Sequence, residues 1–179
     1  MPQYIVLLRA VNVGGRKLTM SEARDVLQDN DFTDVASHIQ TGNFLVGTRL
    51  RSDLKVEAEV GRVLSAHAGY DIVAIARRPV ELSQLVSDVD GTPPLLPNAR
   101  ARYVSFCTTA PAPEKAKALQ GWDGEGEAAT VIGKDVLMEY AVPFNEAKLT
   151  GARIERILGV PGTARNMTVV RALAEKWGS

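Results

Sequence analysis

Four residues near the start of the chain combine side chains and backbone that could bind an anion. Arg9 carries a planar fork of N–H donors that suits phosphate and carboxylate groups, and Asn12 offers both donors and acceptors. Gly14 and Gly15 follow in a short polar loop that leads toward a predicted helix. Backbone N–H groups at the start of a helix attract anions. The sequence therefore makes Arg9, Asn12, Gly14 and Gly15 candidate ligand-binding residues.

A second set of polar residues lies about thirty positions later along the chain. Gln40, Thr41 and Asn43 add carboxamide and hydroxyl groups around a predicted tight turn. Together the two sets could hold a small anionic ligand, such as a phosphorylated compound or a nucleotide. The same residue types also stabilise turns, so purely local capping, with Arg9 paired to a nearby carboxylate, is the alternative interpretation.

The elements that carry these residues follow from the hydrophobic pattern. Residues 4–8 are uniformly apolar and rich in β-branched side chains, which predicts a strand covered on both faces. Thr19 and Glu22 form the capping-box pattern of a helix. Alternation over residues 35–40, a turn at 41–43 and a return strand at 44–46 follow. A helix from Ser52 or Asp53 and a strand at 72–76 complete this half of the chain.

This order, strand-helix-strand-strand-helix-strand, is that of a ferredoxin-like unit. In such a unit the first and third strands are central neighbours, so Arg9 and Asn43 are expected at the same end of the sheet. The second half predicts a strand at 102–108, a helix from Pro113, a hairpin of strands 128–132 and 136–140, a helix after Thr150 and a last helix capped by Thr163. This is an incomplete repeat that ends in a helix.

The predicted fold class is therefore α+β, with two ferredoxin-like subdomains packed together. Residues 1–90 would form the first, with an added helix from Pro79. Residues 91–99, which contain three prolines, would form a linker, and residues 100–179 the second subdomain.

A further polar group lies near the end of the chain. It consists of basic side chains and one carboxamide: Lys148, Arg153, Arg156, Arg165 and Asn166. A phosphate or nucleic-acid contact at a helix start is one interpretation, and a solvated face paired with Glu146 and Glu155 is the other. Arg165 and Asn166 join the candidate ligand-binding residues, and the sequence leaves open whether they reach Arg9.

Composition restricts the classes of function. The formal net charge is zero and the pI is about 6.7, so nucleic acid and anionic membranes gain no long-range attraction. Nucleic acid is therefore a less favoured partner. No apolar run is long enough to span a bilayer. The single cysteine, Cys107, rules out a disulfide framework and favours a cytoplasmic protein. The oligomeric state stays open.

Catalytic chemistry has little support in the sequence. Of the two histidines, His38 lies nearer the predicted turn, but no nucleophile pairs with it. No metal-ligand spacing or phosphate-loop pattern is present, so neither a metal nor a cofactor is predicted. An enzyme acting at the same residues, an RNA-binding module and an oligomerisation or interaction protein remain as alternatives to ligand binding.

Four segments together resemble a known family. They read LLRAVNVGG, IQTGN, KLTGARIERILGV and TARNMTVVRALAE, and their order is similar to that in the bacterial family called domain of unknown function 1697. The resemblance implies an α+β fold with ferredoxin-like parts and a cytoplasmic setting, but no reaction and no catalytic residues. This chain has Met167 where the family pattern has Trp. That position is either a ligand contact or a packing site.

Overall fold

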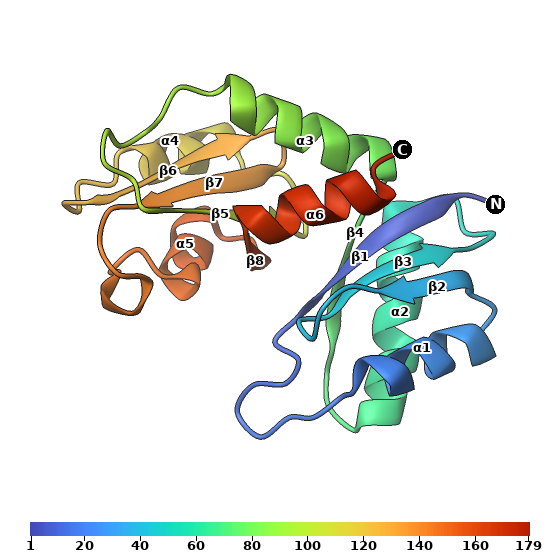
Figure 1. The fold of residues 1–179 in the computed structure, drawn as a ribbon. Coiled ribbons are helices and arrows are strands. Elements are labelled where there is room, and N and C mark those ends of the chain that lie inside the picture. The colour runs from blue at the N-terminus through green and yellow to red at the C-terminus, as the bar shows by residue number, and fades with distance from the viewer. The chain divides into compact units, whose positions relative to one another are not determined.

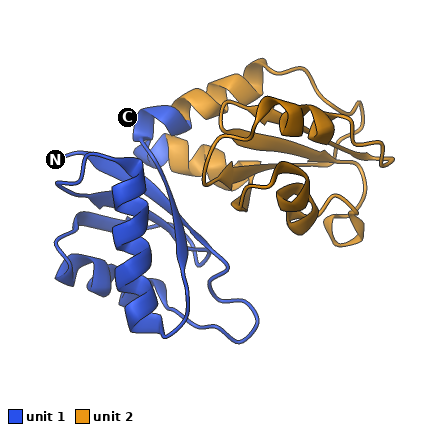
Figure 2. Cartoon of the chain, turned by 180° about the vertical axis from the view of Figure 1, so that it is seen from behind, with its two compact units in different colours: residues 1–82, 175–179 blue, residues 83–174 orange.

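The structure is a computed structural model that describes residues 1–179. It contains two compact units, shown in different colours in Figure 2. The first unit comprises residues 1–82 and 175–179, and the second comprises residues 83–174. Residues 92–99, most of the predicted linker, contain no helix or strand, and the domain boundaries drawn from the sequence stay a prediction.

The first unit is a complete ferredoxin-like fold (Figure 1). Its antiparallel sheet has the strand order β2-β3-β1-β4, so β1 and β3 are central neighbours as predicted. Its elements are β1 (Gln3–Arg9), α1 (Met20–Asp29), β2 (Thr33–Ser37), β3 (Asn43–Gly47), α2 (Asp53–Ala68) and β4 (Val73–Arg77).

Strand β1 is buried on both faces, as its unbroken apolar run predicts. Tyr4, Val6 and Leu8 belong to the core beneath the two helices, which includes Leu27 of α1 and Leu64 of α2. Ile5 and Leu7 alternate with them, point to the opposite face and are also fully buried. The central strand therefore places Arg9 at a defined end of the sheet.

The second unit repeats this topology, with the strand order β6-β7-β5-β8. Its elements are the greater part of α3 (Pro79–Gly91), β5 (Ala101–Cys107), α4 (Pro113–Gln120), β6 (Glu127–Ile132), β7 (Asp135–Tyr140), a short 3-10 helix η1 (Phe144–Glu146), α5 (Gly151–Leu158), β8 (Gly162–Asn166) and the greater part of α6 (Met167–Trp177). The α+β fold with two ferredoxin-like parts is therefore confirmed.

One detail of the prediction is wrong, because the second half has a fourth strand. Strand β8 pairs with β5 along one edge of the sheet. Its buried positions are Thr163 and Arg165, which are polar, so the segment lacks the apolar alternation that identifies a strand. Thr163 consequently lies within β8 and does not cap the last helix. Asn166 precedes α6, and its Oδ1 accepts the N–H of Thr168 at 2.8 Å.

Two buried glutamates hold loops of the second unit in place. Glu139 is fully buried, accepts the backbone N–H groups of Leu95 and Leu96 at 2.9 Å each, and lies 2.7 Å from the Arg102 guanidinium. Glu127 accepts the Leu149 N–H and the indole N–H of Trp122. Because Oε2 of each glutamate accepts loop N–H groups, and Oε1 of Glu139 lies beside Arg102 of β5, these carboxylates are structural.

Candidate functional site

The end of β1 and the β2–β3 turn meet at one end of the first unit (Figure 1). Leu7 lies opposite Asn43 in the ladder, and the Leu8 N–H donates to the Gly42 carbonyl oxygen at 2.8 Å. The structure therefore brings Arg9 to the turn that contains Gln40, Thr41 and Asn43. We call residues 9–18 and 38–43 together the rim.

Two rim carboxamides are occupied by their own loops. Asn43 is fully buried, and its Nδ2 donates to the His38 carbonyl oxygen at 3.1 Å and to Thr41 Oγ1 at 2.8 Å. Asn12 has a left-handed backbone with φ of 57°, and its Oδ1 accepts the Leu18 N–H at 2.9 Å. Asn43 therefore shapes the rim and is too deeply buried to contact a ligand, whereas Asn12 braces its loop through Oδ1 and keeps an exposed amide.

Gly14 and Gly15 form the exposed tip of the β1–α1 loop, with φ values of 59° and 80°. They precede the helix by more than a turn, because α1 begins at Met20 with Thr19 as its cap. The Glu22 N–H already donates to Thr19 Oγ1, and Thr19 N–H donates to the Glu22 carboxylate. The two glycines thus offer loop amides, and the predicted capping box of Thr19 and Glu22 is confirmed as the start of the helix.

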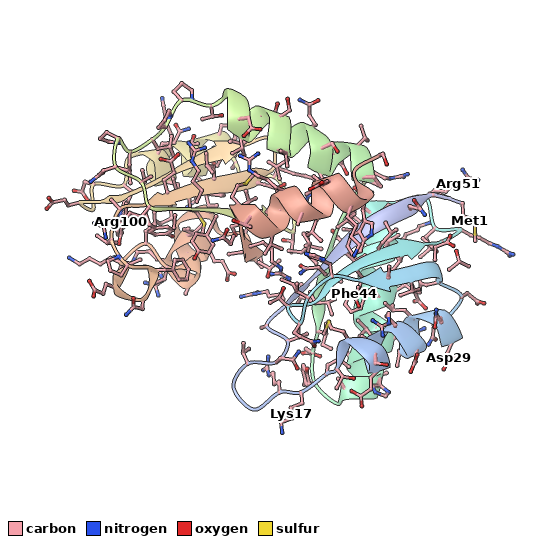
Figure 3. The ribbon with its side chains drawn as sticks, in the orientation of Figure 1. Met1, Lys17, Asp29, Phe44, Arg51 and Arg100 are labelled. Atoms are coloured by element: carbon pink, nitrogen blue, oxygen red, sulfur yellow. The ribbon has the colours of Figure 1, made fainter.

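The rim is rich in cations and poor in carboxylates, a feature that the search for sequence motifs did not identify. Residues 1–20 and 35–52 contain no Asp or Glu, whereas Arg9, Arg16 and Lys17 lie in the first of these segments. Figure 3 shows Lys17 on the outer side of the loop. The missing carboxylates were visible in the sequence, and the structure confirms the prediction that both segments contribute to one end of a sheet.

An aromatic side chain supports the cationic loop from below. The Arg16 guanidinium lies 5.4 Å from the ring centroid of Tyr70, within the range of a cation–π contact. Tyr70 precedes β4, whose Val73 pairs with Arg9, so it belongs to the same end of the unit. The nearest acidic residues along the chain at this end are Glu22, which is engaged with Thr19, and Asp71.

The backbone of the rim contains strained positions. Ala10, Asn12 and Ile39 are three of the five non-glycine residues with positive φ. A β-branched residue such as Ile39, with φ of 51°, is uncommon in this region. Each such position costs about 1–3 kcal/mol, and strain of this kind clusters at binding sites. The structure also corrects the predicted strand, because β2 ends at Ser37 and Ile39 turns outward.

Two of the remaining polar side chains differ in their surroundings. Gln40 is exposed, and its carboxamide has no hydrogen-bond partner within the protein. His38 is half-buried, and its ring lies edge-on to Trp177 with 6.3 Å between the centroids. His38 is thus packed against an aromatic ring, while Gln40 can reach a ligand.

Arg165 and Asn166 belong to the second unit and have structural partners there. The Arg165 guanidinium is 7% exposed and donates to Thr163 Oγ1 at 2.8 Å and to the Ala164 carbonyl oxygen at 3.0 Å. Burial lowers the pKa of Arg165 to about 10. Asn166 caps α6, as described above, and Met167 is buried, which supports the packing interpretation of Met167.

Other hollows of the two units suit an anion less well than the rim. A cleft of about 510 Å³ at the opposite end of the first unit is lined by Arg49 but also by Asp31 and Glu59. The two carboxylates would repel an anion. A cleft of about 330 Å³ in the second unit is lined by three guanidinium groups, those of Arg100, Arg102 and Arg171. Arg100 could contact an anion there, but two of the three are not available. Arg102 is paired with Glu139, and Arg171 is paired with Asp90. No group of three or more His, Cys, Asp or Glu residues could hold a metal ion.

The fold and the comparisons define the class of protein. Both units are ferredoxin-like, and the chain is similar over 100% of its length, and over 99% of the other chain, to the conserved bacterial protein SP0830 from Streptococcus pneumoniae, with a TM-score of 0.65 and 17% identity. At that identity the likeness shows the fold alone. The chain belongs to the family described as "Protein of unknown function (DUF1697)", whose model matches residues 1–137. No curated protein matches the chain. None of its helices has the length and hydropathy needed to cross a membrane.

Proposed function

We propose that this protein binds a small anionic or nucleotide-like ligand at the rim. The observation that carries the proposal is the placement of Arg16 and Lys17 on the exposed β1–α1 loop, in a segment without carboxylates that meets a second such segment at the β2–β3 turn. Exposed amides at Gly14 and Gly15 add donors to the same loop. A negative group that reaches this surface gains charge-assisted hydrogen bonds, which are about twice as strong as neutral ones.

The residues of the rim divide into those that hold its loops and those that we expect to contact the ligand. Asn12 and Asn43 hold the two loops in position, while Lys17, Arg16 and the glycine amides are placed to contact the ligand. Arg9 lies at the junction of the two segments, at the end of β1. The chain has a single cysteine and so no internal disulfide, which supports a cytoplasmic location for this activity.

RNA binding through the sheet has less support. Such modules present aromatic side chains on their central strands for stacking with bases. Here the aromatic residues of β1 and β3 are Tyr4 and Phe44, and both are buried in the core beneath the helices. The central strands therefore offer no stacking surface.

Calorimetric titration with pyrophosphate, sugar phosphates and nucleotides tests the proposal. We expect at least one phosphorylated compound to bind, and the double variant Arg16→Ala/Lys17→Ala to lose about tenfold or more in affinity, since tenfold corresponds to about 1.4 kcal/mol. The variant Arg9→Ala should weaken binding in the same direction.

The matched control is Arg49→Ala/Arg51→Ala, which removes the same charge from exposed residues at the other end of the unit. Figure 3 shows Arg51 far from Lys17. This control should keep the wild-type affinity. The proposal is wrong if no phosphorylated compound binds, or if both double variants weaken binding equally. Thermal melting of each variant shows that the fold is retained.

A further inference from the structure

Aliphatic side chains are exposed at the same end of the first unit as the rim. Seven large hydrophobic residues of the whole chain are exposed, and three of them lie at this end of the first unit. They are Val13, 53% exposed in the β1–α1 loop, Ile39, 46% exposed in the β2–β3 turn, and Val73, 39% exposed at the start of β4. A purely ionic ligand would have no use for these side chains.

Val73 and Arg9 are direct neighbours. They pair across the β1–β4 ladder, and directly opposite residues in an antiparallel pair project from the same face about 5 Å apart. That face is the one turned away from α1 and α2, because the adjacent Leu8 and Ala74 belong to the helix-side core. The Val73 and Arg9 side chains therefore project from the same face of the sheet at this end.

Ile39 is held outward at a cost. Its left-handed backbone is disfavoured for a β-branched residue, and its side chain remains 46% exposed. The next residue is Gln40, whose carboxamide has no partner in the protein. A carboxamide presents one donor and one acceptor side by side, the arrangement that pairs with the edge of a nucleobase.

We infer that the ligand of the rim is a nucleotide, with its base against the Ile39 side chain and the Gln40 carboxamide of the β2–β3 turn, and its phosphate at Arg16, Lys17 and the glycine loop. This inference rests on the proposed function and names the ligand class. The combination of one flat apolar group, one donor–acceptor edge and one anion is met by a nucleoside phosphate. A sugar phosphate lacks the first two features.

Affinities for three sets of compounds test this inference. They are the four nucleoside 5′-monophosphates, ribose 5-phosphate, and the corresponding nucleosides. At least one monophosphate should bind about tenfold or more tightly than ribose 5-phosphate. If ribose 5-phosphate binds as tightly as every monophosphate, the base is not recognised and this inference fails while the proposed function stands. If no phosphorylated compound binds, both fail.

Two variants separate base recognition from folding. Ile39→Asn removes the apolar side chain but suits a left-handed backbone, so the protein should be at least as stable as the wild type. Gln40→Ala removes the carboxamide from an exposed position. Each should lower nucleotide affinity about fivefold or more and leave affinity for ribose 5-phosphate unchanged. Leu54→Gln, at an exposed aliphatic residue of α2, is the matched control and should change neither affinity. Equal losses for both compounds, or no loss of nucleotide affinity, would overturn the inference.

Discussion

The Leu8 N–H donates to the Gly42 carbonyl oxygen at 2.8 Å, and this bond joins the end of β1 to the β2–β3 turn. The contact is close enough that a Cβ at Gly42 would lie 2.8 Å from the Leu8 Cβ and 3.0 Å from a Val11 methyl group. The approach of these two segments is what assembles the rim, so its energetics can be measured directly.

Replacing Gly42 by alanine should destabilise the protein strongly. Gly42 has φ of 77°, which costs an alanine about 1–2 kcal/mol, and forcing the new methyl group against Leu8 adds about 1–3 kcal/mol. Gly69→Ala is the matched comparison, since φ there is 76° and no atom lies within 4 Å of the new Cβ. Gly69→Ala should lose only the part of the unfolding free energy that comes from the left-handed backbone, about 1–2 kcal/mol. Urea denaturation that gives equal losses for the two variants would show that β1 and the turn are not in tight contact.

Removing the Glu139 carboxylate should destabilise the second unit. Glu139→Ala leaves the Leu95 and Leu96 N–H groups without acceptors and separates Arg102 from its partner. Breaking a buried ion pair costs about 3–5 kcal/mol. Because the Arg102 side chain is 28% exposed and can be hydrated, we expect the lower end of that range. Thermolysin should also cleave the segment around Leu95 faster.

Asp90→Asn is the control for the Glu139 variant. Asp90 forms an ion pair with Arg171, but both side chains are exposed, and exposed pairs are hydrated and screened by salt. This substitution should change the denaturation midpoint little and leave cleavage near Leu95 unaltered. A midpoint shift as large as that of Glu139→Ala would contradict the structural role given to Glu139.

Stability at high pH should depend on Tyr140. Burial, and then the charge of Glu127, raise the pKa of Tyr140, whose hydroxyl donates to the Leu149 carbonyl oxygen at 2.7 Å. A raised pKa in the folded state means that the stabilisation is complete below the unfolded pKa of about 10 and is lost as pH rises above it. The unfolding free energy should therefore fall above about pH 10.

Tyr140→Phe should flatten that pH dependence. The variant loses about 1 kcal/mol of hydrogen-bond energy at neutral pH but has no phenol to ionise at this position. Burial also raises the pKa of Tyr4, so the difference between wild type and variant is the informative quantity. Urea denaturation from pH 8 to about pH 11 measures it, and parallel curves would show that Tyr140 does not contribute.

The sequence predicted the parts of the fold that depend on apolar periodicity and local capping. The uniformly apolar run of residues 4–8 predicted that β1 lies at the centre of the sheet. Thr19 and Glu22 form the expected capping box. From the element order it followed that Arg9 and Asn43 share one end of a sheet, as the register now shows. These features follow from short-range patterns that the sequence displays directly.

The features that escaped prediction depend on long-range context. Strand β8 was missed because its buried side chains, Thr163 and Arg165, are polar. Asn43 could not be recognised as fully buried, since its partners depend on the turn geometry. Ile39 fitted an alternating strand pattern, yet its left-handed backbone directs it outward. The Tyr70 ring beneath Arg16 required the fold as a whole.

Amide chemical-shift changes on nucleotide titration are the most direct test of the rim as a ligand site. With a nucleoside 5′-monophosphate, we predict the largest changes at the amides of Gly14, Gly15, Lys17 and Gln40, and none at Gly47 or Arg49 at the other end of the same sheet. Saturable changes confined to residues outside the rim, or no changes at millimolar nucleotide, would contradict the account.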